Sequence, residues 1–142
     1  MGKPTMNPAY LDTQFWGTIH LSNLPSLCYI ITAWNPMDKR LCLKENKQRN
    51  LVLQEEIKNE GHLCIEITGS SKDLSHQEPS FLTSAPQENL IKWAKKFNQR
   101  AIFEILNDSL FLVPTDQPDQ KLKLGSFKER IRGSSEQLKQ SM

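Results

Sequence analysis

Two titratable side chains lie close together in the stretch 75–81. His76 and Glu78 are two residues apart, and an extended backbone would place both side chains on the same side of the chain. A carboxylate beside an imidazole can act as a general acid or base, or can ligate a metal ion. Ser80 follows nearby, but a catalytic triad depends on a geometry that spacing alone does not define. The simpler interpretation is a loop in which Glu78 accepts backbone N–H bonds.

A metal site is not expected around this pair. The other two histidines, His20 and His62, lie elsewhere, and the three cysteines lack the two-residue spacing that is typical of zinc sites. The sequence has no glycine-rich dinucleotide motif, no Walker loop and no nucleophile elbow. We therefore expect no metal and no cofactor, and we expect the cysteines to be reduced.

The segment 43–60 carries a second group of polar candidates. Its apolar period, and the glycine that follows it, predict a long helix. Asn46 and Asn50 fall on the stripe that continues to Leu53 and Ile57, which are expected to be core residues. Two alternatives stay open for the amides. Either they hydrogen-bond the backbone where the preceding strand ends, or they contact a ligand.

Residues near this stripe add further candidates. Trp34 and Asn35 end the first predicted strand, which would bring them close to the two amides. Arg49 lies at the margin of the stripe, where it could pair with Glu45 or hold an anion near the helix N-terminus. Gln99 comes just after the second predicted helix, and its polar side chain has no structural explanation there.

The elements that must position these residues follow a regular order. Apolar β-branched runs and helical periods predict βαββαββ, with strands at 27–34, 63–68, 78–82, 101–106 and 110–113 and helices at 43–60 and about 85–97. The first six elements match the split βαβ, or ferredoxin-like, arrangement. Right-handed crossovers would put both helices on one face of the sheet. The predicted fold class is therefore α+β, one small domain with a ferredoxin-like sheet.

Composition divides the 142 residues into three parts. Residues 1–25 are polar and rich in loops, and we expect them to pack on the domain, in part as a short helix over 9–16. Residues 26–114 carry the clean periodicity of the α+β domain. Residues 115–142 form a polar, mildly basic C-terminal tail. Its charge is a weak signal for nucleic acid, so a solvated tail is favoured.

Charge and hydropathy exclude several classes of protein. The net charge of +2 and the hydrophobic fraction of 37% fit a folded chain rather than a disordered one. No apolar run approaches the ~18–20 residues of a membrane span. The first residues lack the apolar stretch of a signal peptide. We expect a cytoplasmic protein that does not associate with membranes.

Four runs together resemble a known family. They are YIITAWNP at 29–36, EN with RNL between 45 and 51, HQEPSF at 76–81 and AKKFNQRAIF at 94–103. In this order they resemble the bacterial domain-of-unknown-function family 3293 (DUF3293), over roughly residues 15–114. The resemblance implies a bacterial origin and a small single domain, and it brings no assigned activity. Its motifs fall on the polar residues to which the periodicity also points.

The leading hypothesis is a binding domain for a small polar ligand. Amides, an arginine and a glutamate beside an aromatic wall suit a ligand with mixed donors and acceptors, such as a nucleotide or nucleoside. The expected ligand-binding residues are Trp34, Asn35, Asn46, Arg49, Asn50, His76, Glu78, Ser80 and Gln99.

Two other functions remain open. The chain could be an enzyme that uses Glu78 as general base and His76 as its partner. A buried Glu78 with a raised pKa would favour this alternative. The chain could instead be an interaction module that docks a protein, or with less support a nucleic acid, through its sheet edge and basic tail. An exposed apolar patch beside a poorly formed pocket would favour the module.

Overall fold

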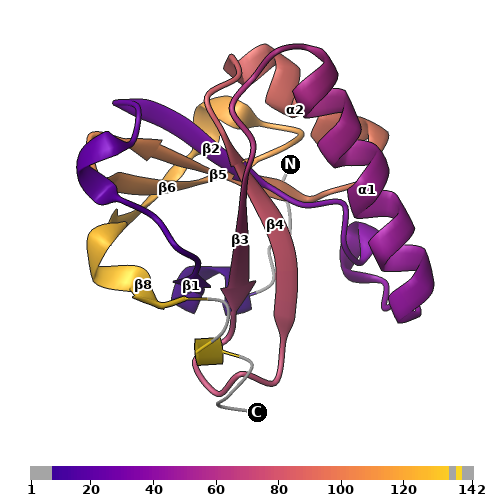
Figure 1. Cartoon of the computed structure of the whole chain (residues 1–142), viewed down its shortest axis with the longest axis horizontal. Coiled ribbons are helices and arrows are strands. Elements are labelled where there is room, and N and C mark those ends of the chain that lie inside the picture. Colours follow the sequence, from indigo (N-terminus) through magenta and orange to yellow (C-terminus); the bar gives the residue numbers. More distant parts are fainter. Residues whose placement is uncertain (1–7, 135–136, 139–142) are drawn as a thin grey trace.

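One large curled sheet organises the chain, as the computed structural model shows (Figure 1). Within residues 8–134 and 137–138, which are those that the structure describes, the sheet has eight strands in the order β7-β6-β5-β2-β4-β3-β1-β8. Neighbouring strands run antiparallel, apart from the parallel pair β1 and β8. The strands are β1 (Gln14–Trp16), β2 (Leu27–Ile31), β3 (Ile65–Ser70), β4 (Gln77–Thr83), β5 (Ala101–Leu106), β6 (Ser109–Pro114), β7 (Leu122–Ser126) and β8 (Ile131–Gly133).

The predicted ferredoxin-like α+β fold is wrong. The chain forms an eight-stranded sheet that curls toward a half-barrel, and its two α-helices in the described part cover only one side (Figure 1). Local patterns predicted the strands between residues 27 and 114. They did not predict β7 at one end of the sheet, or β1 and β8 at the other. A wide twisted sheet tends to curl because each strand is rotated relative to its neighbour.

The two faces of the sheet bury different sets of side chains. Alternation along β2 sends Tyr29 and Ile31 to the helix side, and Cys28 and Ile30 to the opposite, inner side of the curl. The helix-side core also contains Leu53, Ile57, Phe81, Leu90, Trp93, Ala94, Phe97, Ile102 and Val113. The inner core contains Phe15, Ile67, Leu82, Ile105, Leu110 and Phe127. The inner side therefore has its own apolar surface on which a site can be built.

Helix α1 (Leu43–Asn59) has the predicted register. It buries Asn46 and Asn50 together with Leu53 and Ile57, which confirms the prediction that polar and apolar residues share its buried stripe. Gly61 has φ +79° just beyond the helix, a left-handed conformation that glycine adopts without strain. Helix α2 (Gln87–Lys96) packs against β2 and β5. No helix in the described residues is long and apolar enough to cross a membrane.

The segments outside 26–114 join the same sheet. The expected helix over 9–16 is instead a short 3-10 turn, Pro8–Asp12, followed by β1. The segment expected as a polar tail contributes β7 and β8. The parts of the predicted segments 1–25 and 115–142 that fall on residues 1–7, 135–136 and 139–142 lie outside the described residues.

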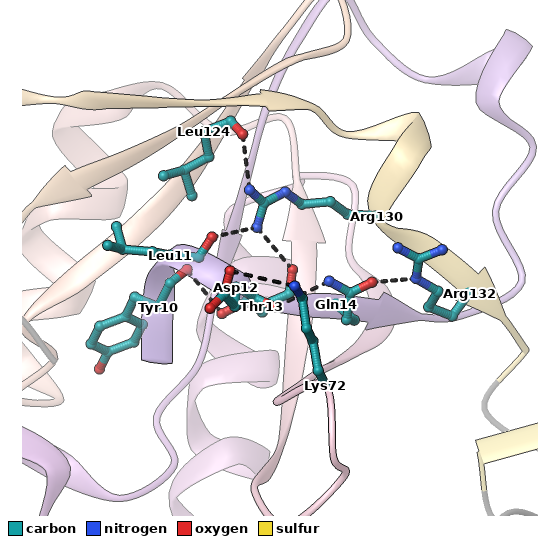
Figure 2. A network of polar contacts seen from close by, with 9 residues as sticks. All are labelled: Tyr10, Leu11, Asp12, Thr13, Gln14, Lys72, Leu124, Arg130 and Arg132. Atoms are coloured by element: carbon teal, nitrogen blue, oxygen red, sulfur yellow. Dashed lines mark hydrogen bonds and ion pairs between the residues drawn. The ribbon is translucent and has the colours of Figure 1, made fainter. Parts of the chain in front are cut away.

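Arg130 ties these two ends of the chain together, as Figure 2 shows. Its Nη1 donates to the carbonyl oxygens of Leu11 at 2.8 Å and Thr13 at 3.2 Å, and its Nη2 donates to that of Leu124 at 2.8 Å. One guanidinium therefore connects the chain just before β1 to β7, the strand at the far edge of the sheet. This contact holds the N-terminal segment, which forms one wall of the site described next.

Candidate functional site

A cavity of about 410 Å³ opens on the inner side of the curled sheet. Its apolar wall comes from three strands: Phe15 of β1, Ile30 of β2 and Phe103 of β5. The rings of Phe15 and Phe103 meet edge to face, with their centroids 5.2 Å apart. Polar side chains surround this wall, so the cavity combines an apolar surface with hydrogen-bonding groups.

Seven of the nine predicted site residues line this cavity. They are Trp34, Asn35, Asn46, His76, Glu78, Ser80 and Gln99. The other two, Arg49 and Asn50, do not line it. Strand ends and loops that are far apart in the sequence thus meet at this cavity. The sequence had predicted one such contact, between Asn35 and the amides of the helix.

Glu78 is the charged group that distinguishes this cavity. Alternation along β4 places its side chain on the same face as Ser80 and the inner-core residue Leu82. The carboxylate makes no hydrogen bond or ion pair with residues 8–134 or 137–138. Burial, and then the negative charge of Asp38, raise the pKa of Glu78 to about 7. The cavity therefore holds an unpaired acid that is about half ionised near neutral pH.

Asp38, by contrast, is fully compensated. Its Oδ1 accepts from the Tyr10 hydroxyl at 2.9 Å, and its Oδ2 accepts from Arg100 Nε at 2.9 Å. Burial raises the pKa of Tyr10, and the charges of Glu78 and Asp38 raise it further. Tyr10 therefore stays a neutral hydrogen-bond donor beside two carboxylates.

The loop that carries Asp38 has an unusual backbone. Asn35, Met37 and Asp38 have φ values of 47°, 49° and 62°. Positive φ is uncommon for residues other than glycine and carries strain for a bulky residue such as Met37. Tertiary contacts must hold this conformation, and strained backbone often occurs at functional sites.

Gln99 presents a second unused acceptor. It is only 4% exposed, and its Nε2 donates to the carbonyl oxygens of Trp34 and Phe97, both at 3.2 Å. Because carbonyl oxygens only accept, these contacts fix which end of the amide carries the nitrogen. Its Oε1 accepts no hydrogen bond from the described residues, and it belongs to a side chain that lines the cavity.

The amides of the helix serve the architecture first. Asn46 Nδ2 donates to Asn35 Oδ1 at 2.8 Å, and its Oδ1 accepts from the Asn35 backbone N–H at 2.9 Å. Asn50 Oδ1 accepts from Ala33 N at 2.8 Å, and its Nδ2 donates to Pro79 O at 2.7 Å. Of the two alternatives left open by the sequence, these contacts match the one in which the amides hold the end of β2.

Arg49 makes contacts of the same kind. Its Nε donates to Ala33 O at 2.7 Å, its Nη2 donates to Phe97 O, and its guanidinium lies 5.7 Å from the centre of the Phe97 ring. Burial lowers the pKa of this guanidinium. Arg49 thus joins the end of β2 to the end of α2, and it neither pairs with Glu45 nor faces the cavity.

His76 and Ser80 lie on either side of Glu78 in β4 and the preceding turn. His76 is exposed at the rim, and no hydrogen bond joins its imidazole to Glu78 in the described part of the chain. Ser80 is buried, and its hydroxyl donates to the backbone oxygen of Glu78 at 2.9 Å. Both side chains share the cavity with Glu78, but the structure does not pair either of them with its carboxylate.

Several cavity residues escaped the sequence interpretation. Tyr10, Asp38 and Arg40 all line the cavity, but they come from the N-terminal segment and an irregular loop with no periodic pattern. The turn-forming pair at residues 35 and 36 marks a loop there, but not which of its side chains face inward. Phe103 lies on a predicted strand, where alternation alone could have placed it on the same face as Ile105.

The described residues contain no group of three or more His, Cys, Asp or Glu side chains that could hold a metal ion. No curated protein and no solved structure matches the chain. A family model described as "Protein of unknown function (DUF3293)" matches residues 31–102. This match begins at the last residue of β2, contains α1, β3, β4 and α2, and ends within β5, so it includes most of the polar residues around the cavity. The chain belongs to the DUF3293 family.

Proposed function

We propose that the chain is a binding domain for a small polar ligand, which occupies the cavity on the inner side of the sheet. The observation that carries this proposal is the Glu78 carboxylate, which lines the cavity without a partner among the described residues. A half-buried acid without a partner costs free energy of folding. Such a cost is commonly retained where the group serves a ligand or a reaction.

The shape and chemistry of the cavity support a small molecule as the ligand. Its volume of about 410 Å³ falls within the ~300–1,000 Å³ that is typical of ligand pockets. Apolar side chains form one wall, and acceptors such as Glu78 and Gln99 face the same space as exposed donors such as Arg40. A nucleoside, which has a flat ring with polar edges, is one compound class of suitable size and composition.

Native mass spectrometry of the freshly purified protein tests this proposal directly. A co-purified small molecule should appear as an adduct in the wild type and be absent from Ala101→Phe. Ala101 lines the cavity from β5, so a phenyl ring there fills space without removing a polar contact. Leu106→Phe is the matched control, because residue 106 is exposed at the other end of β5 and does not line the cavity. An adduct that persists in Ala101→Phe would contradict the proposed site.

One observation favours an enzyme as the second candidate. The pKa of Glu78 is raised to about 7, which is close to the value that suits a general acid or base at neutral pH. In that case Glu78 would transfer the proton and His76, at the rim, would assist it. Turnover of the co-purified molecule, with loss of turnover in Glu78→Gln, would distinguish this alternative from simple binding.

The remaining parts of the proposal concern partners and location. A formed cavity supports ligand binding over a module that docks a protein or nucleic acid through its sheet edge. We place the protein in the bacterial cytoplasm. Its free thiols at Cys28, Cys42 and Cys64 are compatible with a reducing compartment. Fractionation of the cells that produce it, with detection in the cytosolic fraction, tests this location.

A further inference from the structure

We propose that the cavity selects an organic cation, namely a protonated amine or amidine carried on a small apolar or aromatic body. This inference rests on the proposed function and names the ligand class for the same site. Its basis is the unpaired Glu78 carboxylate, together with the Gln99 acceptor and the apolar side chains that line the same cavity.

The charges around Glu78 leave it uncompensated. Four titratable side chains line the cavity with Glu78: Tyr10 of the N-terminal turn, Asp38 and Arg40 of the loop after β2, and His76 of the β3–β4 turn. Arg100 precedes β5 and does not line the cavity. Arg100 is bound to Asp38, and Arg40 and His76 are exposed. The neighbouring charge that acts on the pKa of Glu78 is Asp38, which raises it. No cation in the described residues pairs with Glu78.

The cavity also offers an unused neutral acceptor. Gln99 Oε1 belongs to a side chain that is 4% exposed, and its orientation is fixed by the two carbonyl groups bound to Nε2. An ammonium or amidinium group brings several N–H donors, so it can satisfy the acceptors in the cavity. An anion would instead meet the uncompensated negative charge of Glu78.

The apolar side chains that line the same cavity suit the body of such a ligand. Phe103 is partly exposed and offers aromatic surface to the cavity, and the fully buried Phe15 packs edge to face against it. Aromatic rings attract cations as well as apolar groups. A cation with a small aromatic body would therefore gain from both the acceptors and the apolar side chains of the cavity.

A cation should keep Glu78 ionised, so its binding should depend on pH. Because the pKa of Glu78 in the free protein is about 7, the ionised fraction rises about tenfold between pH 6 and pH 8. The affinity for an amine that stays protonated over this range should rise by about the same factor. A neutral compound of the same shape should show no such change.

Benzylamine and benzamidine are suitable cationic probes, with benzyl alcohol and benzoate as neutral and anionic counterparts. Ligand-observed NMR and calorimetry on the full chain should show that both cations bind, and that they bind about tenfold more tightly at pH 8 than at pH 6. Glu78→Gln should weaken benzamidine binding at pH 8 by tenfold or more and remove its pH dependence. Glu66→Gln is the matched control, because Glu66 is exposed and lies outside the cavity; it should change the affinity less than twofold.

Three results would overturn the inference in different ways. If benzoate or adenosine binds, Ala101→Phe abolishes that binding, and the cations do not bind, the cation class is wrong while the proposed function stands. If Glu78→Gln binds benzamidine like the wild type, the recognition by Glu78 is wrong. If no probe binds at millimolar concentration and no adduct co-purifies, both proposals fail. If Glu78→Gln does not fold, the binding of charged and neutral probes to the wild type at pH 6 and pH 8 still tests whether the cavity selects a cation.

Discussion

The side-chain amide of Asn46 hydrogen-bonds both the backbone and the side chain of Asn35. Asn46 Oδ1 accepts from the Asn35 backbone N–H at 2.9 Å, while Asn46 Nδ2 donates to Asn35 Oδ1 at 2.8 Å. Asn35 Oδ1 also accepts from the backbone N–H of Leu41 at 3.1 Å. Helix α1 is thereby fastened to the left-handed loop that brings Asp38 to the cavity.

Asn46→Ala should therefore destabilise the protein by about 1–3 kcal/mol, because the buried groups of Asn35 lose their partners. Urea denaturation at pH 7 measures this change. Asn59→Ala, at the exposed end of the same helix, should change the free energy of unfolding by less than about 0.5 kcal/mol. Equal effects of the two substitutions would show that the Asn35–Asn46 pair does not hold the loop.

Glu78 should make the protein less stable as the pH rises. Its pKa in the folded state is about 7, above its ordinary value of 4.5, so between these values the folded state binds more protons than the unfolded state. The free energy of unfolding then falls as pH increases from about 4.5 to about 7, by on the order of 1–3 kcal/mol, and is constant above that range. Glu78→Gln removes this contribution, so the variant should match the wild type near pH 5 and exceed it in stability by that amount at pH 8.

Urea denaturation of both proteins at pH 5, 6, 7 and 8 measures this difference. Glu66→Gln should keep the pH dependence of the wild type, since Glu66 is exposed on β3. A Glu78→Gln variant whose stability falls with pH as steeply as that of the wild type would contradict the assignment to Glu78.

How far the sequence predicts this site depends on the element that carries each residue. Helical periodicity correctly placed Asn46 and Asn50 on the buried stripe of α1, because a single 3.6-residue period determines which side chains share a face. No such rule applies to Tyr10 and Asp38. Tyr10 precedes the residues that Arg130 binds, and Asp38 lies in a left-handed loop, and both of these features are tertiary.

The fold could be predicted locally but not as a whole. The strands and helices between residues 27 and 114 form close to their predicted positions, since each has a clear apolar pattern. The curl of the sheet depends on β1, β7 and β8, which are only three to five residues long. Leu122 and Leu124 alternate with polar residues on β7, a weak strand signal that the surrounding polar composition obscured. Strand pairing over long sequence separations, such as β1 with β8, leaves no mark on the local pattern.

Arg49→Met should separate architecture from ligand binding. The substitution removes the hydrogen bonds to the carbonyl oxygens of Ala33 and Phe97, so we expect a loss of about 2–3 kcal/mol in the free energy of unfolding. Because Arg49 does not line the cavity, the folded variant should bind benzamidine with an affinity within twofold of the wild type. A loss of affinity larger than tenfold, with stability unchanged, would instead make Arg49 a ligand residue.

Arg130 offers a test of the connection between the two ends of the chain and the site. Its guanidinium donates to three backbone carbonyl groups, at Leu11, Thr13 and Leu124 (Figure 2). Arg130→Met keeps much of the apolar stem and removes these charged donors, so it should destabilise the protein by about 2–4 kcal/mol. The stability of Arg130→Lys should lie between those of the wild type and Arg130→Met, because one ammonium group cannot bind three carbonyl groups as a planar guanidinium does.

The effect of Arg130→Met on the segment around β1 is more informative than its effect on overall stability. Hydrogen exchange in Arg130→Met should increase at residues 11–16, since this segment loses its attachment to β7. Thr13 and Phe15 of this segment line the cavity, and Tyr10 directly precedes it, so benzamidine binding should weaken in parallel. Lys128→Met, two residues away and exposed, is the matched control and should leave both measurements unchanged. Faster exchange that spreads evenly over the whole sheet, with no excess at residues 11–16, would show that Arg130 contributes to general stability and does not position the wall of the cavity.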